Sequence, residues 1–519
     1  MNTRTAGRHW AVLAGVLSVT LWVAAGCTSW RIVRYREPSS TNLSMFPTRP
    51  VTRAEVPFRF PERPTQLSLD TLPVRAPDGS RMTWASYMDR YKVLAFVVVV
   101  NDTIVYETYR GGFAESQQLI TFSVTKSILS AMLGIAIGEG RVRSLDDSVV
   151  RYIPTLRSNA AYDGVTLRHL LEMRSGLRHT KTGNGFWSDF RSDEAHFYYT
   201  TNRRKSMAAA TRDHAPGSRW VYKDVDAEVL GWALSNAVGM PLARYLEEKI
   251  WHPVGAEYDA SWSLDGRGGM ESVASGFNAT ARDLARLGQL FLNGGRWGER
   301  QLVPADWVRA SASVDSSRAE PEISNWWKMQ HHLYWWHPLQ PPHGDYYADG
   351  SNGERIYIDP STRTVIVQLA NESNQDFPFR RIAAYFDGRI FEYPRSIPAL
   401  LWQAGRHSAD SVRTAYEALE AARRAAPERH VITASGMNTV GMMLLDSAAT
   451  RTAAIEVLRL TVEHYPDRVL GYLSLATAYE RTGDSVRARE TLDRAAARFP
   501  NDPEVVRRRL VPHPLPRYP

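Results

Sequence analysis

Cysteine is nearly absent from this chain. Cys27 is the single cysteine among 519 residues, which excludes a disulfide within the chain. Lysine is also scarce, since seven of the 63 lysine and arginine residues are lysine. The formal net charge of +8 is dispersed, and neither zinc-finger spacing nor an RNP-like strand occurs, so we expect no nucleic-acid binding. The 44% hydrophobic fraction is typical of a globular protein, and the length predicts two or three folding units.

The N-terminus has the pattern of an export signal. Arg4 and Arg8 precede an apolar stretch from residue 10 to residue 25, and small residues then lead to Cys27. The sequence AAGC resembles a bacterial lipobox, although alanine stands where leucine is usual at its first position. The resemblance implies a signal peptide over residues 1–27, a lipid on Cys27, and a periplasmic protein anchored to the membrane. Thr28, rather than a retaining aspartate, favours the outer membrane; an uncleaved anchor helix is the alternative.

Three regions of different composition follow the signal, and the third begins at residue 405. Residues 28–75 are rich in Pro, Arg, Ser and Thr without periodicity, which predicts an extended tether. Residues 76–395 mix strands and helices. A β-hairpin is predicted over 91–112 with its turn at Asn101-Asp102, and two further strands over 354–371. Strands at both ends with helices between them indicate an α+β fold whose sheet joins the two ends of the domain.

Residues 405–519 are predicted to be helical and contain an internal repeat. Tyr465-Pro466-Asp467 recurs as Phe499-Pro500-Asn501, and Ala454 recurs as Ala488, in each case 34 positions later. This period, with small residues where two helices must cross closely, resembles tetratricopeptide repeats. Two copies are clear and residues 415–429 fit part of a degenerate third. Such repeats imply a protein partner or a brace for the preceding domain.

Residues 121–137 read TFSVTKSILSAMLGIAI, which predicts a buried helix whose first turn carries Ser123 and Lys126. Positions i and i+3 share a helix face, so Oγ and Nζ would lie within reach of each other. The positive end of the helix dipole disfavours a protonated lysine and favours an anion at the serine. By itself, this pair also fits two polar residues that only close a buried helix.

The wider context resembles a known superfamily. The segments GEGRVRSLDDSVVRYIP, VTLRHLLEMRSGL, PGSRWVYKDVDAEVLGWAL and FNATARDLARLGQLFLNGG follow the SVTK helix in order. The series resembles the serine hydrolases of the β-lactamase and penicillin-binding-protein superfamily, especially class C-like esterases and 6-aminohexanoate-dimer hydrolases. Over residues 76–395, the resemblance implies a β-lactamase-like antiparallel sheet flanked by helices, together with an all-helical domain.

The resemblance also implies catalytic roles. Ser123 would be the acylated nucleophile and Lys126 its proton acceptor. Tyr222, in the sequence YKD, matches the tyrosine of the superfamily's YxN or YxS element and would relay protons. Whether Lys126 or Tyr222 is the acylation base stays open. Asp224 stands where penicillin-recognising members have asparagine, and a carboxylate there would tend to keep Lys126 protonated.

The third motif of the superfamily is matched by ADGSNGERIYIDP over residues 348–360, which resembles its AxGxxGQ form. Gly350 would let the backbone approach the substrate, and the amides of Ser351 and Ser123 would form an oxyanion hole. Glu354 replaces the common glutamine. A literal KTG at residues 181–183 precedes the tyrosine motif and is interpreted as a loop. No lysine precedes Gly350, so penicillin hydrolysis is not favoured.

Aromatic residues gather just before this strand. The four tryptophans are Trp326, Trp327, Trp335 and Trp336. They would wall an apolar cleft for an uncharged acyl chain, although core packing fits half of them equally well. The histidines at 331, 332 and 337 lack an HExxH pattern, so we expect neither a metal nor another cofactor. No GxSxG elbow is present.

These patterns favour an exported, membrane-tethered serine hydrolase that cleaves an ester or a small linear amide through a Ser123 acyl-enzyme. One alternative is a catalytically inactive binding or assembly protein of the cell envelope, suggested by Asp224, by Glu354 and by Arg174 where threonine is usual. Another is a peptidoglycan-type carboxypeptidase, which the predicted compartment leaves open.

Overall fold

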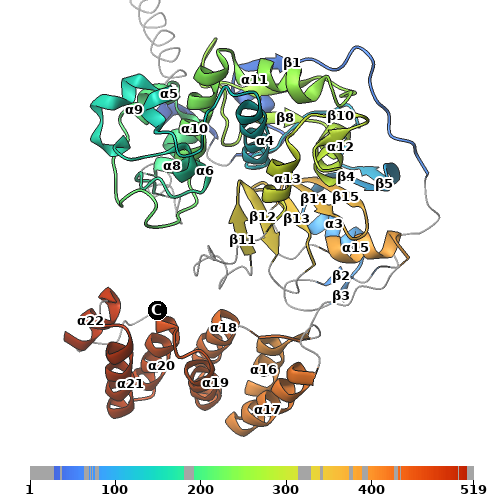
Figure 1. Cartoon of the computed structure of the whole chain (residues 1–519). Helices are drawn as coiled ribbons and strands as arrows, with labels where there is room; N and C mark the ends of the chain where they lie inside the picture. Colours follow the sequence, from blue (N-terminus) through green and yellow to red (C-terminus); the bar gives the residue numbers. More distant parts are fainter. Residues whose placement is uncertain are drawn as a thin grey trace, which may run out of the picture. The chain divides into compact units, whose positions relative to one another are not determined.

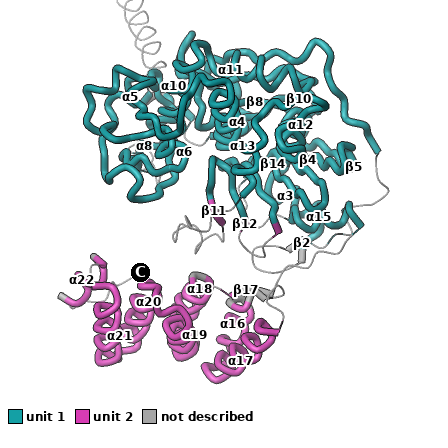
Figure 2. The backbone as a smooth tube through the Cα atoms, in the orientation of Figure 1, with its two compact units in different colours: residues 1–317, 331–337, 344–391 teal, residues 318–330, 338–343, 392–519 magenta. Residues whose placement is uncertain are grey.

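The chain forms two compact units, shown in Figure 2. The computed structural model describes residues 28–35, 38–63, 69, 72, 74–75, 81–180, 192–313, 329–338, 343–372, 378–388, 395–425, 430–432, 434–500 and 502–510. Unit 1 comprises residues 1–317, 331–337 and 344–391, and unit 2 comprises residues 318–330, 338–343 and 392–519. Cys27 and the KTG of residues 181–183 lie outside the described residues.

A seven-stranded sheet is the centre of unit 1 (Figure 1). Its order is β11-β12-β13-β14-β15-β4-β5. The strands are β4 (Val93–Val100), β5 (Thr103–Tyr109), β11 (Met329–His332), β12 (Trp335–Pro338), β13 (Tyr346–Asp349), β14 (Arg355–Asp359) and β15 (Thr364–Ala370). The first and last long strands of the domain, β4 and β15, pair antiparallel with Val99 opposite Val365. The predicted joining of the two ends of the domain is thus confirmed.

The predicted hairpin is also confirmed. β4 and β5 are antiparallel neighbours, and Asn101 and Asp102 between them have φ of 48° and 63°. Two consecutive residues with positive φ are what a tight hairpin turn with the right-handed strand twist requires, and Asn and Asp tolerate that region best among non-glycine residues.

Helices cover both faces of this sheet. Gly288 of α12 (Ala281–Leu292) lies against Val365 and Ile356, so closely that an added Cβ would come within 2.5 Å and 2.9 Å of their side chains. On the opposite face, Phe379 of α15 (Phe379–Phe386) packs 5.5 Å from the ring of Tyr357. The alternation of side chains along β14 assigns Ile356 and Tyr357 to the two faces, so the sheet is buried on both sides.

Residues 38–63 are folded into unit 1, and the expected extended tether is not found there. β1 (Thr48–Val51) pairs with β7 (Ala260–Ser263) at the edge of a second, four-stranded sheet of order β1-β7-β8-β6. The amide of Phe58 donates to Gly255 O at 2.8 Å. The other strands are β6 (Leu119–Ile120) and β8 (Phe277–Ala279). The helix α2 (Thr28–Tyr35) contacts α8 (Asp193–Tyr199).

A helical region completes unit 1. Its central helix is α10 (Asp224–Val238), which contacts α4 (Val124–Gly138), α5 (Val149–Tyr152), α6 (Leu167–Leu171), α8, α9 (Arg203–Ala208) and α11 (Leu242–Leu246). The remaining elements are α3 (Trp84–Arg90), α13 (Ala305–Ser311), the π-helix Glu247–Trp251, the 3-10 turns Leu43–Met45, Pro154–Ser158 and Ala160–Tyr162, and the short strands Val74–Arg75, Arg81–Met82, Arg296–Trp297 and Arg300–Gln301.

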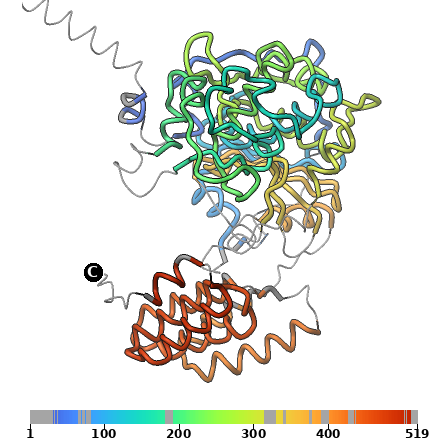
Figure 3. Tube along the Cα trace, turned by 60° about the vertical axis from the view of Figure 1, so that its left-hand side comes forward, coloured from blue at the N-terminus to red at the C-terminus, as the bar shows by residue number. Residues whose placement is uncertain are grey.

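Unit 2 is helical from residue 397 (Figure 3). Its elements are α16 (Ile397–Gly405), α17 (Ala409–Ala425), α18 (Ala434–Leu445), α19 (Arg451–His464), α20 (Val469–Arg481), α21 (Ser485–Arg498) and α22 (Pro503–Leu510), with the short strands Arg395–Ser396 and His430–Val431 and the 3-10 turn Ala448–Thr450. The repeat-related Ala454 and Ala488 are both buried. Gly441 lies so close to Leu458 that an added Cβ would come within 2.4 Å of it. Small residues therefore permit the close helix crossings, as predicted.

Within the residues described, none of the helices has the length and apolar character needed to cross a membrane.

Candidate active site

Ser123 stands at the sharp turn where β6 passes into α4. It is the N-cap of α4, and the residue before it, Phe122, has φ of 43°. That left-handed conformation costs a non-glycine residue roughly 1–2 kcal/mol. Phe122 is held there by burial and by its ring stacking on Tyr198 at 6.3 Å. Ser123 is partly exposed, whereas every residue from 124 to 136 is buried. The turn thus leaves the Ser123 hydroxyl accessible to a substrate, while the helix that follows is buried away from water.

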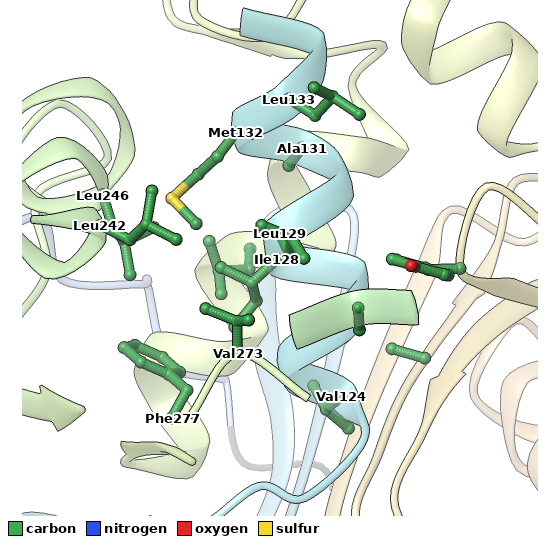
Figure 4. Packing of buried hydrophobic residues seen from close by; sticks show 14 of the residues in the cluster. Val124, Ile128, Leu129, Ala131, Met132, Leu133, Leu242, Leu246, Val273 and Phe277 are labelled. Atoms are coloured by element: carbon green, nitrogen blue, oxygen red, sulfur yellow. The ribbon is translucent and has the colours of Figure 1, made fainter. Parts of the chain in front are cut away.

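The rest of α4 is fixed by apolar packing. Figure 4 shows Met132 beside Leu242 and Leu246 of α11, and Ile128 beside Val273. Because the helix is apolar nearly all round, it is buried all round. This packing explains why the sequence predicted the helix, and it leaves the first turn little freedom to move.

Lys126 is bound to three acceptors. Its Nζ donates to Ser123 Oγ at 2.9 Å and to Ala274 O at 2.8 Å, and it lies 2.8 Å from Asp224 Oδ1. Tyr222 is a fourth hydrogen-bond partner, so all three N–H donors of the ammonium group are engaged. The side chain is 1% exposed. The predicted proximity of Ser123, Lys126 and Asp224 is therefore present in the structure.

The charges of this pair stabilise each other. Burial alone would lower the pKa of Lys126, but the Asp224 carboxylate and Tyr222 raise it above its ordinary value. Burial would likewise favour neutral Asp224, yet the Lys126 ammonium lowers the pKa of that carboxyl. Asp224 is also the first residue of α10, where the helix dipole favours a negative charge. At rest, Lys126 is an ammonium and Asp224 a carboxylate.

Tyr222 completes the polar centre. Its hydroxyl hydrogen-bonds to Ser123 and Lys126, and the Lys126 Nζ lies 5.1 Å from the ring centroid. The main chain next to it is fixed, because Val221 N donates to Met173 O at 3.0 Å. Burial raises the pKa of the Tyr222 phenol and the Lys126 ammonium opposes that shift. Ser123 accepts from Lys126, which leaves its own proton free to point at the phenol oxygen.

The turn after β13 lies against the start of α4. A Cβ on Gly350 would come within 2.8 Å of Thr121 O and 2.4 Å of Glu354 Oε2, so only glycine fits. The exposed residue Ser351 follows. Within the described part of the chain, neither the Ser123 amide nor the Ser351 amide donates a hydrogen bond. Two unengaged amides on adjoining turns are the donors that an oxyanion hole needs.

The two described tryptophans of the predicted cleft have different surroundings. The ring of Trp336 lies 5.6 Å from Tyr222 and 4.8 Å from His331. Trp335 is 2% exposed and packs 4.5 Å from Phe291 of α12. Because neighbouring residues of a strand face opposite sides, Trp335 belongs to the core, and its predicted place in the substrate cleft is not found. Trp326 and Trp327 lie outside the described residues.

Comparison with known proteins assigns the fold to a family. Residues 84–387 match the family model described as Beta-lactamase, which is more than half of the chain. The chain belongs to the beta-lactamase family. Residues 469–511 match the model described as Tetratricopeptide repeat, in agreement with the 34-residue period.

Individual proteins are also similar to this chain. The 6-aminohexanoate-dimer hydrolase of Paenarthrobacter ureafaciens is 26% identical over 391 residues, covering 72% of this chain and 94% of that protein. The "Putative D-alanyl-D-alanine carboxypeptidase" of Escherichia coli strain K12 is 25% identical over 291 residues, covering 46% of this chain and 64% of that protein. The solved structure "Putative 6-aminohexanoate-dimer hydrolase from Bacillus anthracis" superposes with a TM-score of 0.61 at 26% identity, covering 67% of this chain and 94% of that one.

Some residues of this beta-lactamase-family site were not predicted from the sequence. The main-chain carbonyl oxygen of Ala274 accepts a hydrogen bond from Lys126 Nζ, so no side-chain pattern in the sequence marks this residue. His331 lies 5.5 Å from the Tyr222 ring and was considered only as a metal ligand. Among the described residues, no group of three metal-binding side chains occurs. Burial lowers the pKa of His331 well below its ordinary value, so its ring is neutral.

Proposed function

We propose that this chain is a serine hydrolase that cleaves an ester or a small linear amide through an acyl-enzyme on Ser123. The observation that carries the proposal is the shared contact of Ser123 with Lys126 and Tyr222 at the exposed start of a buried helix. Membership of the beta-lactamase family supports hydrolysis, and the relative named as a 6-aminohexanoate-dimer hydrolase supports a linear amide as the substrate class.

The site supports the following steps. The Lys126–Tyr222 pair loses one proton, and Ser123 Oγ attacks the substrate carbonyl carbon while its own proton passes to the Tyr222 oxygen. The amides of Ser123 and Ser351 bind the resulting oxyanion. When the intermediate collapses, the bond to the leaving group breaks and Tyr222 returns the proton to it. A water molecule then attacks the acyl carbon while one of its protons passes to the Tyr222 oxygen. The bond to Ser123 Oγ breaks, Tyr222 returns the proton to that oxygen, and the acid product leaves.

The first experiment measures fluorophosphonate labelling and p-nitrophenyl butyrate turnover in the wild type and in Ser123→Ala, Lys126→Ala and Tyr222→Phe. We expect labelling to vanish in Ser123→Ala, and kcat to fall by about 10²–10⁴ in the other two variants, the usual range for a removed general base. Ser130→Ala is the matched control, because Ser130 is buried in the same helix and its hydroxyl has no partner within the described residues. It should keep full activity.

Other outcomes would favour the alternatives. Equal labelling and turnover in wild type and Ser123→Ala would sink the acyl-enzyme proposal and favour a binding protein of the cell envelope. A peptidoglycan-type carboxypeptidase is the second candidate, favoured by the Escherichia coli relative. Stable labelling of Ser123 by a fluorescent penicillin would support it. The residue before Gly350 is Asp349, an acidic residue where a lysine would bind a substrate carboxylate. The nearby Arg355 is paired with Asp349 at 2.7 Å, and this pairing does not favour a carboxypeptidase.

The proposal includes an exported protein held at the membrane by a lipid on Cys27. The support is the N-terminal pattern of Arg4, an apolar stretch and AAGC. We expect the wild type in the membrane fraction and Cys27→Ser in the soluble periplasmic fraction after cell lysis. Equal membrane association of both would contradict lipidation and favour the uncleaved anchor helix.

The repeats of unit 2 are proposed to bind a protein partner. A cavity of about 270 Å³ lies between α19, α20 and α21. Its lining combines Arg459, Arg487 and Arg494 with Glu463 and Tyr479. Such a mixed lining fits a polar segment of a partner.

A further inference from the structure

The chain segment before β1 contacts both sides of the proposed oxyanion hole. Ser40 is fully buried. Its carbonyl oxygen accepts from the amide of Ile120 at 2.8 Å, three residues before Ser123. Its hydroxyl oxygen lies 2.7 Å from Glu354 Oε1. One residue thus joins the strand that leads to Ser123 and the residue that closes the turn carrying Ser351.

Glu354 holds that turn by two hydrogen bonds. Its Oε2 accepts from the amide of Asn352 at 3.1 Å, and its main-chain oxygen accepts from the amide of Gly350 at 2.7 Å. The N-terminal segment adds a third point of attachment, because Asn352 Nδ2 donates to Pro38 O at 3.1 Å. The position of the Ser351 amide therefore depends on Glu354 and on residues 38–40.

Counting protons at Ser40 indicates the charge state of Glu354. The single hydroxyl proton faces Ala370 O at 2.5 Å, Glu354 Oε1 at 2.7 Å and Asn371 Oδ1 at 3.3 Å. A carbonyl oxygen can only accept, so the shortest contact takes the Ser40 proton. The contact between Ser40 and Glu354 then needs a proton on Glu354. A neutral carboxyl that donates to Ser40 and accepts from Asn352 has the hydrogen-bonding pattern of a glutamine.

The surroundings agree with a neutral Glu354. The side chain is fully buried, and burial raises its pKa to about 8 although the hydrogen bonds with Ser40 and with the main chain of the turn oppose that shift; the nearby Asp349 on β13 adds to it. Asp349 itself is paired with Arg355, and Tyr198 of α8 also interacts electrostatically with Glu354. Among the described residues, no lysine or arginine pairs with Glu354. A carboxylate here would be an uncompensated buried charge.

We infer that Ser40 and a neutral Glu354 form a buried clamp that positions the Ser351 amide for the oxyanion. The inference rests on the proposed function, because the oxyanion arises only if Ser123 is acylated. Ser40 and Glu354 are positioning residues, since neither touches the reacting atoms. The clamp has a built-in pH limit: it is intact while Glu354 is protonated and it loosens as Glu354 ionises.

The test compares Ser40→Ala and Glu354→Gln with the wild type. Ser40→Ala should lower kcat about tenfold with little change in KM, since small misplacements of catalytic groups have effects of this order or larger. Glu354→Gln should keep the wild-type kcat at pH 7 within about twofold, and it should abolish the fall in kcat that we expect for the wild type above about pH 8. Ser44→Ala, a change at an exposed serine of the same segment, is the control.

Amide hydrogen exchange of residues 350–354 supplies a measurement that does not need activity. Ser40→Ala should lose protection there, and at pH 9 the wild type should be less protected than Glu354→Gln. The clamp is overturned if Ser40→Ala matches Ser44→Ala in kcat and protection, or if Glu354→Gln keeps the alkaline fall. If fluorophosphonate fails to label wild-type Ser123 while protection changes as expected, the proposed function fails and the clamp survives as a structural device.

Discussion

At the scale of single residues, Asp224 controls the proton balance of the site. Its carboxylate is 2.8 Å from Lys126 Nζ, and its charge raises the pKa values of both Lys126 and Tyr222. The proposed reaction requires the Lys126–Tyr222 pair to lose a proton before Ser123 can give up its own. Asp224 therefore stabilises the resting form of the site and opposes the reactive one.

The substitution Asp224→Asn tests this balance. Removing the carboxylate lowers the pKa values of Lys126 and Tyr222, so the rising limb of kcat/KM against pH should move toward lower pH. The expected shift is about 1–3 pH units, the usual effect of an adjacent opposite charge. The measurement is ester turnover from pH 5 to pH 10 at constant ionic strength, with and without Asp224→Asn in the Glu354→Gln background, so that the alkaline fall expected from Glu354 does not mask the rising limb. An unmoved limb, with a wild-type thermal melt, would show that Asp224 does not set the proton balance.

At the residue scale, spacing alone indicated that Ser123 and Lys126, i and i+3 at the start of one helix, lie close together, as the structure has them. Tyr222 and Asp224, which precede and begin another helix, were predicted through the family resemblance, and the catalytic roles of all four residues stay predictions. Ser40 could not be found in this way, because it reaches Glu354 across 314 positions from a stretch without periodicity. Ala274 contributes a carbonyl oxygen, which every residue type carries.

At the scale of elements, the strongest local signals are confirmed. The apolar strand Val93–Val100, its Asn-Asp turn and the helix after Ser123 all combine a clear period with a turn or cap residue. β1 has neither. It is four residues long, contains Pro50, and has one buried position. A proline lacks the N–H of a ladder and is tolerated on an edge strand, which is where β1 lies. The sequence therefore predicted a tether where an edge strand folds.

At the scale of the whole molecule, each unit buries its own core. In unit 1 the apolar cluster includes Leu129 of α4, and in unit 2 a separate cluster includes Leu458 of α19. Both side chains are completely buried. The helical hairpins of unit 2 contact mainly their neighbours in sequence, as expected for a repeat array. A unit with its own core can unfold by its own cooperative transition.

The matched pair Leu458→Ala and Leu129→Ala tests this organisation in the full chain. Each change removes the same atoms from a core and should cost about 2–5 kcal/mol in the unit that contains it. We expect calorimetry to resolve two unfolding transitions, and Leu458→Ala should lower the midpoint temperature of only one of them. Ester turnover should stay unchanged in this variant, since no residue of the proposed site lies in the cluster that contains Leu458. Leu129→Ala should lower the other transition and reduce turnover, because it loosens the helix that carries Ser123. A single transition shifted equally by both changes would mean that the two cores unfold together, and the repeats would then be required for the stability of the hydrolase fold.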